Sequence, residues 1–234
     1  MTERDLLTAG LRELGVAECP SAADNLLRYS EILREKNKVM NLTAITDPTE
    51  IVTRHFLDCA ALAPYMPQDG RVLDVGTGAG FPGMPLAILC PQTEFVLLDA
   101  LRKRIDFLNE VIAELGLTNV TAVHARAEEF AAKHREQYDF AVSRAVAQLN
   151  VLAELSLPLV KQGGAFIAMK SKDTDEELER AKKAIRLLGG EIEKIIDYTI
   201  PHTEITHRLV VIRKKNHTPK QYPRPFRKIS ASPL

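Results

Sequence analysis

The chain has 234 residues, of which 45% are hydrophobic and 26% charged, and its formal net charge is zero. This length suits one good-sized core, or one domain with an appendage. No apolar run approaches 18 residues, so no membrane span is expected. The first ten residues include charged side chains and lack the apolar segment of a signal peptide, so no secretory signal is expected. The three scattered cysteines, without a C-x-x-C pair, argue against disulfides and against zinc, and they favour a reducing cytoplasm.

The first 66 residues are predicted to form a helical cap. Helix starts are indicated at Ser21–Asp24 and at Asp47–Glu50, and the second of these has a proline at its first helical position. The second helix is expected to continue to about Ala63. No strand-like alternation occurs in this part of the chain, so the cap is expected to lie against the fold that follows.

From residue 71 onward, strand patterns and helix patterns alternate. Strands are expected over 72–75, 94–99, 120–124, 138–143, 163–170, 191–200 and 206–214, and helices over 84–90, 102–115, 128–134, 149–157 and 173–188. Such alternation specifies an α/β fold with a doubly wound, mainly parallel sheet. The last two strands have no helix between them and should form an antiparallel hairpin at one edge.

Seven strands that end in a hairpin favour the class I S-adenosylmethionine-dependent methyltransferase arrangement, which is Rossmann-like, over the dinucleotide-binding one. The predicted organisation is therefore a helical cap (1–66), a methyltransferase domain (67–215) and a basic tail (216–234).

A glycine loop follows the first of these strands. The segment 72–83 reads VLDVGTGAGFPG, with Gly76, Gly78 and Gly80 in a G-x-G-x-G pattern and Asp74 two residues before it. Glycines permit positive φ and close approach of the backbone to a ligand, so this turn predicts a nucleotide-sized pocket. A carboxylate at Asp74 would repel a pyrophosphate but attract a ligand with a sulfonium and an ammonium, which favours S-adenosylmethionine. A dinucleotide site and a glycine turn that binds nothing remain as alternatives.

Two acidic positions extend this cofactor site. Asp99 ends the second strand, where an acid accepts hydrogen bonds from ribose hydroxyls in this fold. Ala127 and Glu128 follow the third strand, where the adenine edge should lie. The alternative for Asp99 is an N-cap, and the alternative for Glu128 is an acid favoured by the helix dipole.

Several residues are candidates for the acceptor side. Arg144, in Ser143-Arg144-Ala145, ends the fourth strand and is suited to RNA phosphate or to the methionine carboxylate. Lys170 ends the fifth strand and could reach the cleft. The chain has no Asp-Pro-Pro-Tyr or Asn-Pro-Pro-Tyr sequence and no cysteine near the fourth strand, which argues against methylation of exocyclic amines and of pyrimidine C5. His55 and Asp58 share one helical face in the cap, either as a surface pair or as a functional one.

Charge is distributed unevenly along the chain. Residues 208–234 hold eight of the 31 basic residues and no acidic one, so the first 207 residues carry 23 basic against 31 acidic residues. A neutral chain with one basic end suggests a local contact with a polyanion. With Lys170, the predicted RNA contacts are Arg213, Lys214, Lys215, Lys220, Arg224, Arg227 and Lys228. Prolines should keep the tail extended, and Tyr222 and Phe226 could stack on bases. A disordered, solubilising end is the alternative.

Five motifs together carry a family resemblance: GTGAGFPG, LLDALRKRIDFLNEV, SRA, NKVMNLTAI and RHFLDCAAL. With these, nearly the whole chain closely resembles the bacterial glucose-inhibited division protein B family, the small-subunit ribosomal RNA guanine-N7 methyltransferases. The resemblance implies that a cytoplasmic monomer transfers a methyl group from S-adenosylmethionine to guanine N7 of 16S ribosomal RNA, within the 30S subunit or an assembly intermediate. Another RNA or position, a nicotinamide-dependent dehydrogenase and a non-catalytic assembly factor are the alternatives.

The resemblance also implies roles for individual residues. Cofactor contacts are implied at Gly76, Phe81, Ala127, Glu128 and Arg144, and functional roles at Asn41, His55 and Asp58. The chain departs from the family pattern at Cys59, where serine is common, and at Ser171, where glycine is frequent.

Overall fold

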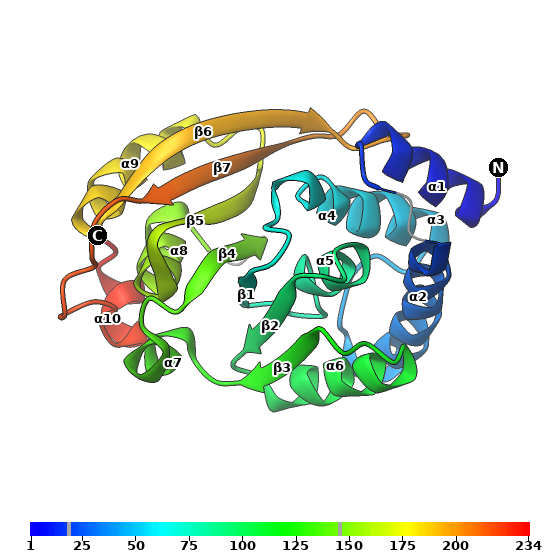
Figure 1. The fold of residues 1–234 in the computed structure, drawn as a ribbon, viewed down its shortest axis with the longest axis horizontal. Helices are drawn as coiled ribbons and strands as arrows, with labels where there is room; N and C mark the ends of the chain where they lie inside the picture. Colours follow the sequence, from blue (N-terminus) through cyan, green and yellow to red (C-terminus); the bar gives the residue numbers. More distant parts are fainter. Residues whose placement is uncertain (18–19, 145–146) are drawn as a thin grey trace.

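A computed structural model of the chain describes residues 1–17, 20–144 and 147–234, and its centre is a seven-stranded sheet (Figure 1). The strands are β1 (Arg71–Val75), β2 (Glu94–Asp99), β3 (Val120–His124), β4 (Tyr138–Arg144), β5 (Val160–Ser171), β6 (Gly190–Thr199) and β7 (Thr206–Lys214). Their order is β3-β2-β1-β4-β5-β7-β6. The first five strands are parallel, and β7 lies antiparallel between β5 and the edge strand β6. The predicted fold class and the terminal hairpin are therefore confirmed.

Helices cover both faces of the sheet, as a doubly wound fold requires. The helices of the α/β part are α5 (Gly83–Leu89), α6 (Arg102–Glu114), α7 (Ala127–His134), α8 (Leu149–Ser156), α9 (Asp175–Leu187) and a 3-10 turn at Leu157–Leu159. Strand β5 shows why two layers are needed: Ala165 and Ile167 join the core under α5 and the cap, whereas Phe166 and Ala168 join the core under α8 and α9. None of the described helices is both long and apolar enough to cross a membrane.

The cap is helical as predicted, but it is less regular than expected. It consists of α1 (Glu3–Glu13), α2 (Pro20–Met40), α3 (Pro48–Ile51), a π-helix (Val52–Leu57), α4 (Asp58–Ala60) and a 3-10 turn (Ala63–Tyr65). The Asp47 side chain accepts a hydrogen bond from the Glu50 amide and so caps α3, as its sequence predicts. Helix α2 begins at Pro20, one residue before the predicted start. The prediction of one continuous helix to Ala63 is wrong, because the π-helix separates α3 from α4.

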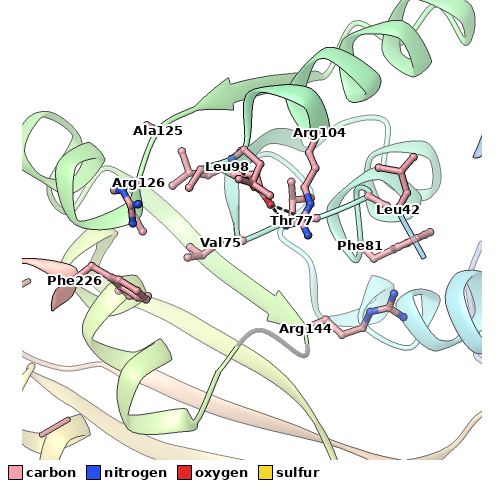
Figure 2. A pocket seen from close by; sticks show the side chains of 18 of the residues that line it. Leu42, Val75, Thr77, Phe81, Leu98, Arg104, Ala125, Arg126, Arg144 and Phe226 are labelled. Carbon is pink, nitrogen blue, oxygen red and sulfur yellow. Dashed lines mark hydrogen bonds and ion pairs between the residues drawn. The ribbon is translucent and has the colours of Figure 1, made fainter. Parts of the chain in front are cut away.

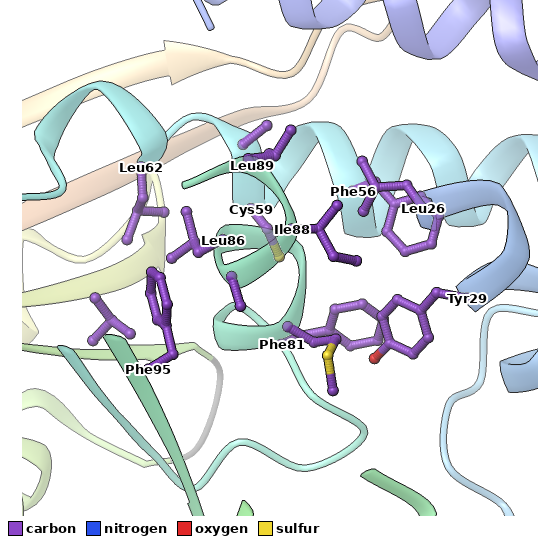
Figure 3. Packing of buried hydrophobic residues seen from close by; sticks show 14 of the residues in the cluster. Leu26, Tyr29, Phe56, Cys59, Leu62, Phe81, Leu86, Ile88, Leu89 and Phe95 are labelled. Atoms are coloured by element: carbon purple, nitrogen blue, oxygen red, sulfur yellow. The ribbon is translucent and has the colours of Figure 1, made fainter. Parts of the chain in front are cut away.

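The cap and the glycine loop are packed into one core. Tyr29 of α2 is fully buried, its ring lies 5.6 Å from that of Phe56 and 5.7 Å from that of Phe81, and its hydroxyl donates to the Ala79 carbonyl. Figure 3 shows these three rings together, with Leu26 beside them. Aromatic pairs of this kind add stabilisation beyond their buried area. The loop that precedes α5 is therefore held from outside by the cap.

The C-terminal segment is folded onto the domain, which corrects the prediction of an extended tail. Residues Phe226–Ala231 form helix α10, which packs on α8 through the fully buried Ile229 (Figure 1). Arg224 makes two side-chain hydrogen bonds, of 2.8 and 2.6 Å, to the fully buried carboxylate of Glu154. The guanidinium of Arg135 donates to three carbonyls of the segment before α10. Proline-rich composition did not keep this chain extended, because buried partners fix its path.

We predict that Arg224→Ala destabilises the fold by about 2–3 kcal/mol, because it leaves the carboxylate of Glu154 buried without its cation. Urea unfolding measures this change in the free energy of unfolding. The matched control is Arg227→Ala, on the exposed side of α10, which should stay within about 0.5 kcal/mol of the wild type. Equal stability of the two variants would contradict the assignment of Arg224 as an anchor.

Candidate functional site

A cavity of about 540 Å³ opens at the carboxyl ends of β1, β2 and β3. In open α/β sheets, ligands bind at this edge, beside the point where the strand order reverses. The lining includes Gly76, Gly78, Asp99, Glu128 and Arg144, which were all predicted cofactor contacts. We call it the first cavity, and Figure 2 shows its lining. Its size lies within the range of small-molecule sites.

The glycine loop forms one wall of the first cavity. The amides of Gly76 and Thr77 both donate to the Leu98 carbonyl, at 2.9 and 3.0 Å, so the loop is fixed to the end of β2. Gly78 has a φ of +63°, and a Cβ added there would meet no atom within 4 Å. The backbone at Gly78 therefore faces open space, where a side chain would take the room of a ligand.

Asp74 lies outside the first cavity, which contradicts its predicted contact with the cofactor. Its side chain is fully buried under the loop, where Oδ2 accepts hydrogen bonds from the Thr77 hydroxyl at 2.6 Å and from the Gly83 amide at 2.8 Å. Among the described residues Oδ1 has no partner. Burial raises the pKa of Asp74 to about 7, although the two hydrogen bonds and the charge of Arg144 oppose the rise. The acid thus shapes the loop from below.

Gly80 also lies outside the first cavity. Its φ is +106°, and a Cβ there would come within 2.6 Å of the Tyr29 hydroxyl and 2.8 Å of Leu108. This glycine is required because the loop packs tightly against the cap, and not because a ligand approaches it. Its predicted cofactor contact is therefore wrong.

Asp99 lines the first cavity, as predicted, and it also organises the loops around it. Its Oδ2 accepts from the Gly78 amide at 3.0 Å and from Arg104 at 3.1 Å, and its Oδ1 accepts from the Leu101 amide at 2.8 Å. The carboxylate therefore joins the glycine loop to the start of α6, but Asp99 is not the N-cap, because Leu101 holds that position without a side-chain cap. Arg104 lines the same cavity and was missed, since its sequence showed only a basic run on a helix.

The other end of the first cavity includes a residue from the C-terminal segment. Ala127 and Glu128, at the start of α7, line this end together with Arg126 and Phe226. The Arg126 guanidinium lies 5.8 Å from the centre of the Phe226 ring. Figure 2 shows these two side chains at the end away from Arg144. Phe226 was predicted to stack on RNA bases, whereas in the structure it lines the first cavity.

Arg144 lies where the first cavity meets a second one. The second cavity, of about 600 Å³, shares His55 and Arg144 with the first and also includes Asp58 and Lys170 in its lining. Arg144 donates to Asp58 Oδ2 at 2.9 Å, and its guanidinium lies over the Phe81 ring at 4.8 Å. Ala145, which follows it, lies outside the described residues. The structure thus brings together Asp58, Arg144 and Lys170, which were predicted from three separate segments.

Two residues of the terminal hairpin complete the setting of Asp58. The Tyr198 hydroxyl donates to Asp58 Oδ1 at 2.7 Å, and His207 Nδ1 lies 2.7 Å from the same oxygen. Burial alone would raise the pKa of Asp58, but the hydrogen bond from His207 and the charge of Arg144 lower it below its ordinary value. Sequence reasoning missed both residues, although a cross-strand Tyr–His pair in the hairpin was a usable signal.

His55 is held as a neutral imidazole. Its Nδ1 lies 3.1 Å from Arg144 Nη2, which can only donate, and 3.2 Å from the Arg54 carbonyl, which can only accept, while Nε2 lies 2.9 Å from Thr43 Oγ1. Burial, followed by the charge of Arg144, lowers the pKa of His55 to about 3. The ring also stacks on Phe81 at 4.3 Å. The pair with Asp58 is therefore buried and is not a surface contact.

The π-helix (Val52–Leu57) contains His55 and ends just before Asp58, so both side chains point at Arg144. Such turns often occur at functional sites. Asn41, in contrast, is exposed and lines neither cavity; its φ of +50° shows that it ends α2 in the left-handed conformation. The structure therefore does not support a catalytic role for Asn41. Thr43, two residues later, is the member of this motif that contacts His55.

The predicted RNA contacts fall into two groups. The first group already has partners within the fold. Lys214 is fully buried and donates to the Leu157 carbonyl. Arg213 pairs with Glu193, and Arg224 pairs with Glu154. Burial also lowers the pKa of Lys214 to about 8. The others are exposed or face the second cavity: Lys170, Lys215, Lys220, Arg227 and Lys228.

The raised pKa of Asp74 predicts a specific pH dependence. Between about pH 4 and pH 7 the folded state keeps a proton that the unfolded chain has lost, so this stabilisation is present at low pH and is lost as the pH rises through 7. Asp74→Asn cannot titrate. Its free energy of unfolding should therefore rise relative to the wild type between pH 4 and pH 7 and then level off.

Urea unfolding at pH 5, 6, 7 and 8 measures this difference in the free energy of unfolding. Any effect of the amide that does not depend on pH leaves the slope of the difference against pH unchanged. Asp69→Asn, at an exposed carboxylate, is the control and should follow the wild-type curve. A wild-type curve parallel to that of Asp74→Asn would show that Asp74 stays ionised.

Solved structures share the fold of this chain. TYW2 from P. horikoshii, in complex with MeSAdo, aligns with a TM-score of 0.55 at 16% identity, over 68% of this chain and 62% of that one. TYW2 from M. jannaschii, in complex with AdoMet, aligns with a TM-score of 0.54 at 16% identity, over 66% of this chain and 72% of that one. At this identity the likeness concerns the fold alone.

Sequence relatives identify the family. The family model described as rRNA small subunit methyltransferase G matches residues 22–206. Two relatives are named ribosomal RNA small subunit methyltransferase G. The protein from Alkaliphilus metalliredigens (strain QYMF) is 47% identical to this chain, over 96% of this chain and 95% of the relative. The protein from Alkaliphilus oremlandii (strain OhILAs) is also 47% identical, over 100% of each chain. The chain therefore belongs to the rRNA small subunit methyltransferase G family.

Proposed function

We propose that this protein transfers a methyl group from S-adenosylmethionine to N7 of a guanine in 16S ribosomal RNA. The observation that carries the proposal is the junction at Arg144, where the cavity beside the glycine loop meets a second cavity. Methyl transfer requires a donor and an acceptor in line across such a junction. Family membership supplies the ribosomal substrate, and we place the activity on the 30S subunit or an assembly intermediate in the cytoplasm.

The residues of the first cavity fit the methyl donor. The open backbone at Gly78 leaves room beside a ligand, and the carboxylate of Asp99 can accept from ribose hydroxyls at the end of β2. Ala127 and Glu128 would then contact the adenine edge, with the Phe226 ring beside them. When bound, S-adenosylmethionine supplies an electrophilic methyl group on a sulfonium.

The second cavity suits an acceptor that needs no general base. Guanine N7 has a lone pair and no proton, so the task of the protein is to position it, which can contribute roughly 7–11 kcal/mol. His55, neutral and hydrogen-bonded, cannot be the acid of such a step. Asp58 is ionised and sits behind Arg144, where its charge can offset the positive charge that forms on the purine.

The RNA would approach the face onto which both cavities open. Exposed cations follow the carboxyl ends of successive strands: Arg102 and Lys103 at the start of α6, Arg126 before α7 and Lys172 after β5, together with Arg54 from the cap. Arg227 and Lys228 add to them from α10, next to Phe226. Cations near phosphates supply most of the affinity for RNA, and they make it salt-dependent.

Donor affinity should depend on both ends of the first cavity. Gly78→Val should abolish binding of S-adenosylmethionine, because a branched side chain at positive φ fills the open space. Phe226→Ala should weaken binding about fivefold, since an aromatic contact contributes about 1 kcal/mol. Titration calorimetry measures both, with Lys228→Ala on the same helix as a control of unchanged affinity. Wild-type affinity in Gly78→Val would remove the donor from this cavity.

Arg144 gives the test of the reaction itself. With purified protein, S-adenosylmethionine and either free 16S RNA or 30S subunits, mass mapping should find one new 7-methylguanine. Arg144→Lys keeps the charge but loses the fork that holds Asp58 and His55, so we expect kcat/KM to fall by about 10²-fold with the fold intact. Arg180→Ala, at an exposed arginine of α9, should leave the rate unchanged. A methyl group on any other base would refute the proposed function.

A further inference from the structure

The second cavity contains a charged pair that the reaction itself does not use. Lys170 is the penultimate residue of β5 and Glu177 lies in the first turn of α9, and both line the cavity together with His55 and Arg144. Their side chains are only 10% and 23% exposed. A cation and an anion this deeply placed at the wall of an acceptor pocket present fixed hydrogen-bonding groups to whatever enters it.

The pair has a donor and an acceptor side by side. Lys170 Nζ donates to Glu177 Oε1 at 2.6 Å and to the Ala147 carbonyl at 2.6 Å, which accounts for two of its three N–H groups. Glu177 Oε1 also accepts from the Leu149 amide at the start of α8. Both bonds to the carboxylate are made to Oε1, and Oε2 takes part in neither. Within residues 1–17, 20–144 and 147–234, one N–H of Lys170 and Oε2 of Glu177 therefore remain for a ligand.

Guanine presents the complementary groups in the same order. Its O6 is an acceptor, and the adjacent N1–H and 2-amino group are donors, whereas N7 lies on the other side of O6. We propose that Lys170 and Glu177 recognise the acceptor guanine: the ammonium donates to O6, and Oε2 of the carboxylate accepts from N1–H and the 2-amino group. Held in this way, the base turns N7 away from the pair, toward the side of the cavity that holds Arg144 and His55.

The same pair rejects adenine. Adenine would present its 6-amino donor to the ammonium of Lys170 and its N1 lone pair to the carboxylate of Glu177, so donor would face donor, acceptor would face acceptor, and neither group would gain a partner from the base. A site built to hydrogen-bond a substrate discriminates strongly against a base that leaves its polar groups without partners. Selection of guanine then precedes the methyl transfer and needs no contact to N7.

This inference rests on the proposed function, and the competing explanation is that the pair only fixes the start of α8 through the Leu149 amide. Inosine separates the two, because it keeps O6, N1–H and N7 and lacks only the 2-amino group. The target guanine, once mapped, is replaced by inosine through splinted ligation, and the RNA is tested free and after reconstitution with ribosomal proteins. For the wild type, loss of one hydrogen bond to a carboxylate should lower kcat/KM by about ten- to a hundredfold.

Glu177→Gln keeps an oxygen for the Leu149 amide but removes the charge, so its preference for guanine over inosine should shrink by about fivefold or more. Glu176→Gln, at the exposed neighbour that pairs with Arg180, is the matched control and should keep the wild-type preference. Equal rates of the wild type on guanine and inosine would overturn the inference while leaving the proposed function intact, and so would an unchanged preference in Glu177→Gln. If the wild type methylates no guanine, the proposed function fails first.

Discussion

The arrangement of this site depends on the buried ion pair between Arg144 and Asp58. The two side chains are 14% and 1% exposed, so desolvation of each charge has to be offset by full hydrogen bonding. Tyr198 and His207 of the hairpin meet this requirement at Asp58, and His55 of the cap contacts Arg144. One pair thus ties together three parts of the chain that are distant in sequence. Removal of any one of these groups would leave a buried charge with fewer hydrogen bonds.

The glycine loop is fixed by the same logic from two other directions. Asp74 holds it from below through Thr77 and Gly83, and the Tyr29 hydroxyl holds it from the side of the cap. A glycine-rich loop would otherwise be costly to order. Because its neighbours fix it in advance, a bound ligand need not supply that ordering, and the free energy of its contacts can serve binding and orientation.

The sequence predicted those features that depend on periodicity and on strand ends. Alternating strand and helix patterns placed the sheet and the hairpin, and residues at strand ends such as Asp99 and Arg144 line the first cavity because parallel strands end at one edge. The rotamer of Asp74 could not be read in this way, since an acid there can face the ligand or the loop. The π-helical turn that aims His55 and Asp58 at one arginine depends on tertiary packing and has no simple periodic signal.

The C-terminal segment shows how charge patterns mislead when burial is unknown. Lys214 and Arg224 look identical to the exposed cations in sequence, yet each compensates a carboxylate of the fold, Glu136 and Glu154 respectively. β7 runs antiparallel to β5, so Lys214 lies at the end of the sheet opposite the cavities. The chain then returns along α8, and Phe226 enters the lining of the first cavity. The basic C-terminal segment, predicted from sequence to bind RNA, is therefore also a structural part of the first cavity.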